Sequence, residues 1–444
     1  MKIYLDHSAT TPPDPEVALL MNKVQKEFWG NASSAHSFGL GARNILNEAR
    51  DTVAFSLNCQ PEEVIFTSGG SESNNLAIKG LIDAYHSNTD QKNNRATPHV
   101  ITSAVEHHSV LDTVKELEKQ GLIEASYVTP QKNGVIRVED IDAEIKDNTV
   151  LVSIMYVNNE IGTVQPIKQI AQMIAKNNEL RIMNNGKKSN VTEPNKHNSS
   201  FFIHNSGNKF AKQIYFHTDA VQAMEYFQTG VRYLGVDLLT FSAHKFYGPK
   251  GVGALFVKNG TPIIRQIVGG NQENKMRAGT ENVAGIAGLS AALVKMHKAK
   301  ADSKIEESGK LLPELILYDE TKRLKQLRDK LIKGLMKIPD TRVNGCLKRR
   351  SPNNVNVSFK NAEGESILLM LDKEGIAASS GSACTSGSLE PSHVLTAIGV
   401  SPEWSHGSIR FSLGKHNTEE EIDRVIEILP GIIKKLRQMS PYGK

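Results

Sequence analysis

Short apolar, β-branched runs alternate with segments of helical periodicity between residues 63 and 257, and this alternation constrains the fold more than any other feature. The runs are EVIFTS, HVITS, TVLVSIMYV, IYFHTD, VDLLTFS and GVGALFV. Apolar residues at three- and four-residue spacing predict helices at 16–28, 40–57, 106–120 and 167–177. Strands that are apolar throughout and separated by helices are typical of a mostly parallel sheet covered on both faces. The sequence therefore predicts an α/β protein.

A second, smaller α+β domain is predicted for residues 283–444. A long helical region begins at residue 283, and the strand-like NNVNVSF and SIRFSL then alternate with helices near 363–373 and 418–436. We expect residues 1–15 to join this domain, which leaves residues 16–282 as the larger one.

One stretch interrupts the larger domain. Residues 184–213 are rich in Asn, Lys and Ser and contain too few apolar side chains to bury a core of their own. We predict an inserted surface loop there.

Composition excludes several classes of protein. The 53 basic and 48 acidic residues are scattered along the chain, so no direct nucleic-acid binding is indicated. No run of about 18 apolar residues occurs, so no membrane span is expected. The cysteines, Cys59, Cys346 and Cys384, lie far apart and predict neither a disulfide framework nor an intrinsic metal site. The start of the chain lacks the pattern of a targeting leader, which predicts a cytoplasmic protein. Import into a mitochondrion or a related organelle through an internal signal is the alternative.

The motif FTSGGSESNNLAIKG has the pattern of a phosphate site. A predicted strand runs into Gly69 and Gly70, and Ser71 then caps a helix. The free amides of such a helix start, with the serine hydroxyl, suit an anion. A capped helix that binds nothing is the alternative, and for this motif alone it is the commoner outcome.

The motif FSAHKFYGPKGVGALFV places Lys245 after a predicted strand, close to Ser242, His244 and Gly248. Ligands of open α/β folds bind at the carboxyl ends of the strands. A lysine there could form a Schiff base with an aldehyde cofactor. Most lysines are solvated surface residues, but the neighbouring hydroxyl, imidazole and glycine favour a phosphate nearby.

Other predicted strand ends carry further polar side chains. Asp219 follows an apolar run in YFHTDAVQA, with Gln222 three residues later. A buried carboxylate needs a partner, and a pyridinium nitrogen would provide one. His107 in VEHHSV, and Asn158 and Asn159 in YVNNEIGTVQP, could each equally be a turn former or a helix cap. Together the strand ends offer a phosphate cradle, a planar group for stacking, a carboxylate and a lysine. Pyridoxal 5′-phosphate (PLP) requires this set.

These motifs occur in one order with YLDHSATT, GNASSAHSFG, RAGTEN, EGIAASSGSACTSGSLEPSHVL and SIRFSLG. Over nearly its full length the sequence resembles the cysteine desulfurases of the NifS/IscS type, which are class V aminotransferases and PLP enzymes of fold type I. The resemblance implies a homodimer that converts L-cysteine to L-alanine. It also implies that sulfur passes through an enzyme persulfide to an iron–sulfur scaffold protein, and it allows small activating or tRNA-thiolation partners.

The resemblance assigns a role to each site residue. Lys245 would attach PLP covalently and move a proton, His107 would stack on its ring and assist proton transfer, and Asp219 would hold the ring nitrogen. The remaining cofactor contacts would come from Gly70, Ser71, Asn159, Gln222, Ser242, His244 and Thr280, with Thr280 reaching across the dimer interface. Arg410 would bind the substrate carboxylate, and Asn159 would also contact the substrate.

Cys384 matches the nucleophile of this family. Its thiolate would take the substrate sulfur as a persulfide, and it would contact a nascent iron–sulfur cluster only during transfer. A buried structural thiol is the usual alternative for a free cysteine, but the tract SSGSACTSGS lacks apolar neighbours. A selenocysteine lyase or another PLP enzyme of the same fold is one alternative function, and an inactive scaffold in a sulfur-transfer complex is another.

Overall fold

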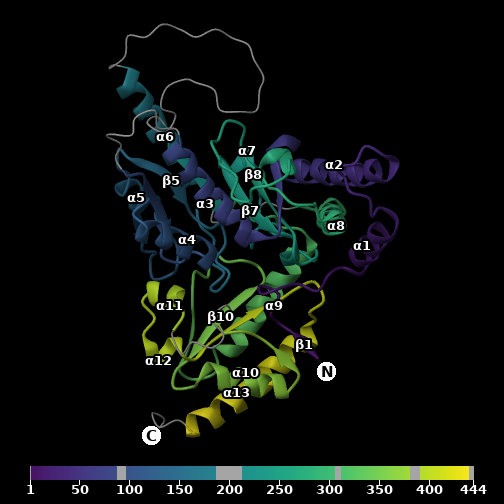
Figure 1. Cartoon of the computed structure of the whole chain (residues 1–444). Coiled ribbons are helices and arrows are strands. Elements are labelled where there is room, and N and C mark those ends of the chain that lie inside the picture. Colours follow the sequence, from purple (N-terminus) through teal and green to yellow (C-terminus); the bar gives the residue numbers. More distant parts are fainter. Residues whose placement is uncertain (1, 88–96, 187–212, 306–311, 381–390, 440–444) are drawn as a thin grey trace.

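The computed structural model describes residues 2–87, 97–186, 213–305, 312–380 and 391–439 (Figure 1). Cys384 lies outside the described residues, as does most of the predicted insertion at 184–213. None of the described helices has the length and apolar content needed to span a bilayer.

A seven-stranded sheet with the order β2-β8-β7-β6-β5-β3-β4 forms the centre of the larger body. Every neighbouring pair is parallel except the two made by β8, which is antiparallel to β2 and to β7. The strands are β2 (Val64–Thr67), β3 (His99–Ser103), β4 (Glu124–Val128), β5 (Thr149–Ser153), β6 (Tyr215–Asp219), β7 (Leu238–Ser242) and β8 (Gly253–Val257). The predicted α/β fold with a mostly parallel sheet is confirmed.

Helices cover both faces of this sheet (Figure 1). The helices of the larger body are α1 (Pro15–Glu27), α2 (Ser37–Leu57), α3 (Gly70–Ser87), α4 (His108–Lys119), α5 (Val138–Ala143), α6 (Ile167–Gly186), α7 (Val231–Leu234) and α8 (Val283–Ala301). Within β5, Leu151 belongs to a hydrophobic cluster with residues of α3 and α4, whereas Val152 belongs to a second cluster that includes residues of α2 and α6. Successive strand residues point to opposite faces. A strand buried on both faces therefore carries apolar side chains toward both of them.

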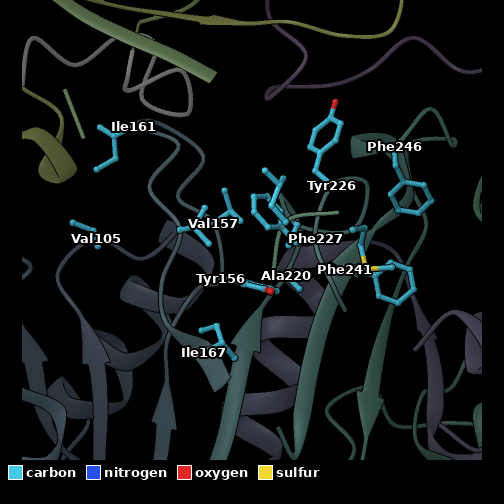
Figure 2. Packing of buried hydrophobic residues seen from close by; sticks show 14 of the residues in the cluster. Val105, Tyr156, Val157, Ile161, Ile167, Ala220, Tyr226, Phe227, Phe241 and Phe246 are labelled. Atoms are coloured by element: carbon cyan, nitrogen blue, oxygen red, sulfur yellow. The ribbon is translucent and has the colours of Figure 1, made fainter. Parts of the chain in front are cut away.

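Aromatic residues pack the loops that follow the central strands (Figure 2). Tyr156, after β5, lies 5.7 Å from Phe227, after β6, between ring centroids. Phe241 of β7 and Phe246, just after it, lie 6.2 Å apart in the same way. These contacts provide a packed base for side chains at the carboxyl edge of the sheet.

A three-stranded antiparallel sheet of order β12-β10-β9 forms the smaller body. Its strands are β9 (Thr341–Val343), β10 (Asn354–Phe359) and β12 (Ser408–Ser412), and its helices are α9 (Asp319–Leu335), α10 (Gly364–Lys373), α11 (His393–Ala397), α12 (Pro402–Ser405) and α13 (Glu419–Met439). Near the start of the chain, β1 (Ile3–Tyr4) pairs in parallel with β11 (Ile376–Ala377). The N-terminal segment thus lies against residues of the smaller body.

The domain boundary expected at residue 283 stays a prediction. That boundary assigns α8 to the smaller domain, whereas α8 packs against α1 and α2 (Figure 1). A Cβ atom at Gly288 of α8 would lie 2.7 Å from Sδ of Met21 in α1, so the glycine permits this close packing. Strand β4 was also absent from the predicted strands, because its residues Glu124 to Tyr127 are partly exposed and lack an apolar run.

Candidate active site

Lys245 lies at the carboxyl edge of the large sheet. It ends the 3₁₀ turn η3 (Ala243–Lys245) that directly follows β7. Its Nζ donates hydrogen bonds to the main-chain oxygens of Ser8 at 2.6 Å and Ala9 at 2.7 Å. The N-terminal segment therefore holds this half-buried amine at the edge where ligands of such sheets bind.

Asp219 is the last residue of β6, and it is 5% exposed. Oδ2 accepts a hydrogen bond from Nδ2 of Asn74 at 2.8 Å, and Oδ1 accepts one from the main-chain nitrogen of Val221 at 2.9 Å. Both donors are neutral N–H groups. A buried carboxylate with only neutral donors is further stabilised by a cation brought against it, and a protonated ring nitrogen is such a cation.

His107 caps the N-terminus of α4, where its Nδ1 accepts a hydrogen bond from the main-chain nitrogen of Ser109 at 3.1 Å. Burial lowers the pKa of His107, and Lys245 acts in the same direction while Asp219 opposes it. The imidazole and the carboxylate are also linked by hydrogen bonds, since Nδ2 of Asn74 donates both to Asp219 and to Ser109, whose Oγ lies 2.7 Å from Nδ1 of His107. A neutral imidazole offers a flat face for stacking on an aromatic ring.

Phosphate binding was predicted for the start of α3. The helix begins at Gly70, so the first-turn N–H groups of Gly70 and Ser71 have no partner within the helix. A Cβ atom at Gly70 would lie 2.9 Å from Cγ2 of Val221 and 3.9 Å from Cβ of Ser242. Glycine at this position lets the helix start approach the ends of β6 and β7. Ser71 is exposed and Ser242 is buried.

His244 lies between Ser242 and Lys245, and its Nδ1 is 3.2 Å from Oγ1 of Thr10. Burial lowers the pKa of His244 to about 4, and the two neighbouring lysines, Lys245 and Lys250, act in the same direction. The ring is therefore neutral near pH 7, and it would contact a phosphate as a hydrogen-bond donor.

Gln222 and Asn159 lie beside these groups. Nε2 of Gln222 donates to the main-chain oxygen of Ser8 at 2.9 Å, which is the oxygen that also accepts from Lys245. The main-chain oxygen of Asn159 accepts from Nη1 of Arg410 at 3.1 Å, so the loop after β5 meets the smaller body here.

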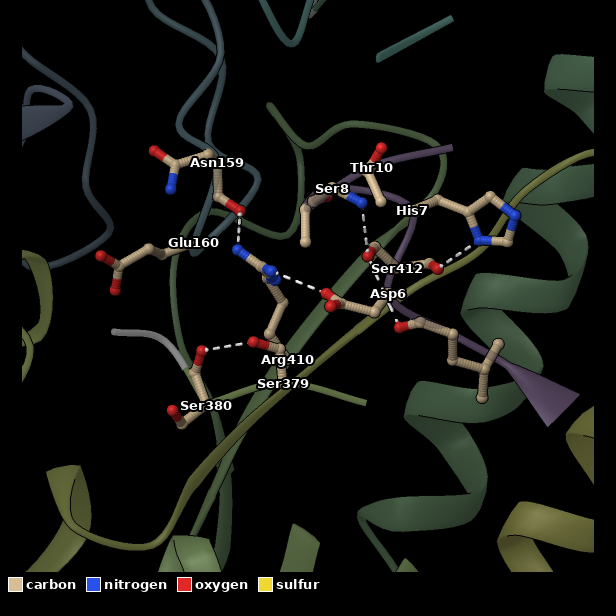
Figure 3. Close-up of polar contacts among 12 residues, drawn as sticks. Asp6, His7, Ser8, Thr10, Asn159, Glu160, Ser379, Ser380, Arg410 and Ser412 are labelled. Carbon is tan, nitrogen blue, oxygen red and sulfur yellow. Dashed lines mark hydrogen bonds and ion pairs between the residues drawn. The ribbon is translucent and has the colours of Figure 1, made fainter. Parts of the chain in front are cut away.

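Arg410 extends from β12 toward this loop (Figure 3). It is 2% exposed, and its Nη2 donates to Oδ1 of Asp6 at 2.8 Å. Its Nε is buried and has no hydrogen-bond partner among the described residues. A guanidinium with an unused buried donor is suited to a carboxylate ligand.

Thr280 and Cys384 were also predicted to belong to the site. Thr280 lies before α8 and is exposed, and no hydrogen bond within the described chain connects it to the other site residues. Its assignment depends on a dimer and stays a prediction. Cys384 lies outside the described residues, and its role also stays a prediction.

Asn74, Ser109 and Asp6 contact the site residues but were not predicted from the sequence. Asn74 carried a detectable signal, because it precedes Ala77, Ile78 and Leu81 at the spacing of one helix face. A polar residue on an otherwise apolar face requires a specific partner, and Asp219 is that partner.

These residues fit PLP. A helix start bordered by small and hydroxyl side chains suits its phosphate, a buried carboxylate suits its ring nitrogen, and an amine at the end of β7 suits its aldehyde. The fold and the site together define the class of PLP-dependent enzymes with a mostly parallel sheet.

The chain belongs to the aminotransferase class-V family, whose model matches residues 3–185 and 202–425. Enzymes of this family use PLP. A cysteine desulfurase IscS from Methanosarcina thermophila is 45% identical over 439 residues, which cover 99% of this chain and 94% of that relative. A solved NifS-like protein is 31% identical with a TM-score of 0.79, and the match covers 98% of this chain and all of that one. A structure described as SspA in complex with cysteine is 30% identical with a TM-score of 0.72, and the match covers 94% of this chain and 100% of that one.

Proposed function

We propose that this chain is a PLP-dependent cysteine desulfurase that converts L-cysteine to L-alanine and supplies the sulfur for iron–sulfur cluster assembly. The observation that carries the proposal is the position of Arg410, which reaches from β12 to the loop after β5 and ends beside Asn159. An amino acid attached near Lys245 would have its carboxylate within reach of this guanidinium. The names of the similar proteins, and the cysteine bound to one of them, support the same substrate.

The cofactor would be held by the residues described above. The α3 start with Ser242 and His244 would bind the phosphate, Asp219 the ring nitrogen, and Lys245 the aldehyde carbon. Gln222 and Asn159 would contact the ring substituents. When bound, PLP withdraws electrons from the α-carbon of an attached amino acid.

The protein side chains then have separate tasks. Arg410 orients the substrate through its carboxylate, which aligns the α-carbon with the amine of Lys245. Lys245 would accept the proton from that carbon, and His107 would cover the cofactor ring and exclude water from that side of the site.

Cys384 is proposed as the sulfur acceptor. Its thiolate attacks the substrate sulfur, an S–S bond forms, the C–S bond breaks, and the electron pair of that bond passes to the carbon that becomes the methyl group of alanine. In sum, L-cysteine and the enzyme thiol give L-alanine and an enzyme persulfide, so no external oxidant is needed. We further propose that a homodimer brings Thr280 to the phosphate, that the persulfide sulfur passes to an iron–sulfur scaffold protein, and that the protein acts in the cytoplasm.

The test is to supply the purified PLP-loaded protein with L-cysteine and to measure L-alanine and the enzyme persulfide by mass spectrometry. Cys384→Ala should retain the visible absorbance of bound PLP but lose persulfide formation and sulfide release. Cys346→Ala is the matched control and should behave as wild type.

Release of sulfide at the wild-type rate by Cys384→Ala would refute the persulfide route. Turnover of L-selenocysteine but not of L-cysteine would identify a selenocysteine lyase, and failure to bind PLP would identify an inactive scaffold.

A further inference from the structure

A chain of hydrogen bonds connects Asp219 to His107 through two residues with no assigned role. Nδ2 of Asn74 donates to Oδ2 of Asp219 and to Oγ of Ser109, each at 2.8 Å. Oγ of Ser109 lies 2.7 Å from Nδ1 of His107. The chain thus connects the carboxylate proposed for the ring nitrogen to the imidazole proposed for the ring face.

The direction of each hydrogen bond follows from the carboxylate. The carboxylate of Asp219 only accepts, so Asn74 must present its NH₂ group to it. The second hydrogen of that NH₂ group goes to Oγ of Ser109, which leaves the hydroxyl proton for Nδ1 of His107. The main-chain N–H of Ser109 also points to this Nδ1, at 3.1 Å. Nδ1 is therefore an acceptor, and the ring proton lies on Nε2.

The burial of Asn74 argues against a purely structural role. The residue is 1% exposed, and its Oδ1 has no hydrogen-bond partner among the described residues. A buried acceptor without a partner destabilises a protein by about 1–3 kcal/mol. An apolar side chain at this position would avoid that penalty. The two hydrogen bonds that the NH₂ group donates, to Asp219 and to Ser109, therefore account for an amide here.

Asn74 also lies one turn after Gly70 in α3. The same helix therefore presents the proposed phosphate cradle and the bridge between Asp219 and His107. A movement of α3 would therefore displace the proposed phosphate cradle and the bridge between Asp219 and His107 together.

We propose that Asn74 is a positioning residue that holds His107 as a neutral imidazole with its proton on Nε2, and that couples this state to Asp219. The inference rests on the proposed function only in that His107 and Asp219 face PLP. It restricts proton exchange by His107 to Nε2, because Nδ1 is occupied by Ser109.

Several groups act on the protonation of His107. Asp219 of β6 and Asp112 of α4 favour the charged ring, whereas Lys245 and His108 disfavour it. In Asn74→Ala, the hydroxyl of Ser109 is free to turn and accept a proton from Nδ1. Asp219 also loses a neutral donor, so its charge acts more strongly on the ring. Both changes raise the pKa of His107.

The experiment is an NMR pH titration of ¹⁵N-histidine-labelled protein loaded with PLP and free of L-cysteine, with the His107 signal assigned by its loss in His107→Gln. Asn74→Ala and Ser109→Ala should each raise the pKa of His107 by about 0.5–1 unit, the size expected for one hydrogen bond. The double variant should shift it no further than Asn74→Ala alone, because both residues belong to one chain of hydrogen bonds.

Asn75→Ala is the matched control. The neighbouring amide donates to the main-chain oxygen of Ser71 within its own helix, so this change should leave the His107 titration as in wild type. An unchanged tautomer and pKa in both Asn74→Ala and Ser109→Ala would overturn the proposal. If circular dichroism shows that Asn74→Ala is unfolded, the proposal is tested by the His107 titration of Ser109→Ala alone. The shift in a protein that does not turn over L-cysteine would support this inference while refuting the desulfurase proposal.

Discussion

Oδ1 of Asp6 lies 2.8 Å from Nη2 of Arg410, although the two residues are 404 positions apart in the chain. The Arg410 side chain is 2% exposed and that of Asp6 is 20% exposed. A charge at such depth is stable only when it is paired. The N-terminal segment thus supplies the counter-charge for the guanidinium that we propose to bind the substrate carboxylate.

Removing this counter-charge should destabilise the protein. Breaking a buried ion pair by removing one partner lowers the free energy of unfolding by about 3 kcal/mol or more, because the other charge stays buried. We expect a loss of this size for Asp6→Ala in urea denaturation. Asp140→Ala, which removes an exposed pair with Arg137, should change the same free energy by less than about 1 kcal/mol. Equal losses in the two variants would contradict the buried pair.

Lys245→Ala should abolish turnover. Loss of a group that both attaches the cofactor and transfers a proton should reduce kcat by at least about 10²-fold. The visible absorbance of covalently bound PLP should disappear with it. Lys250→Ala, at an exposed lysine of the same motif, is the control and should retain both properties. Normal absorbance in Lys245→Ala would show that another amine binds the cofactor.

Glu106 should make stability depend on pH. Burial raises the pKa of Glu106 from its ordinary 4.5 to about 8, despite hydrogen bonds from Ser103 and Met155. Between these pH values the folded protein retains a proton that the unfolded chain releases. The free energy of unfolding should therefore fall as the pH rises through this window.

Glu106→Gln should reduce that fall, as measured by urea denaturation at several pH values. Some dependence should remain, because burial also raises the pKa of Glu160, to about 7. Glu116→Gln, at an exposed position of α4, should leave the wild-type dependence unchanged. If the free energy of unfolding of Glu106→Gln depended on pH as in wild type, the retained proton would belong to another group.

Two glycine substitutions should have opposite effects. A Cβ atom at Gly253 of β8 would lie 2.6 Å from the main-chain oxygen of Phe241 and 2.8 Å from Cα of Gly69. Gly253→Ala should therefore push the start of α3 away, destabilise the protein by about 1–3 kcal/mol, and weaken PLP binding. Gly431→Ala, in α13 with no atom within 4 Å of the added Cβ, should stabilise it by about 0.5–1 kcal/mol. Thermal unfolding and a PLP titration would measure both, and equal shifts would refute the packing argument.

The larger sheet was predictable because most of its strands are buried on both faces, which gives them short, largely apolar runs between the helices. Strand β4 was not predictable, because it lies at the edge of the sheet and its first four residues are partly exposed. The packing of α8 against α1 and α2 was not predictable either, since helical periodicity shows that α8 has an apolar face but does not show which helices cover it.

Within the site, sequence motifs predicted Lys245, Asp219 and His107 because each has a distinctive side chain at a strand end. The groups that hold them were harder to find. Lys245 donates to two main-chain oxygens, and an oxygen of the main chain has no signature in the sequence. The pairing of Asp6 with Arg410 joins distant segments, and no local pattern encodes such a contact.

Because β1 pairs with β11, the N-terminal segment can take its final place only late in synthesis of the chain. The strand made first must wait for Ile376 and Ala377 before it acquires a partner, and the carbonyls that hold Lys245 lie just after that strand. Asp6 likewise has no Arg410 until β12 has left the ribosome. The larger sheet can assemble during translation, but its active site is completed only when nearly the whole chain has emerged, so a truncated nascent chain would be folded in part and catalytically silent.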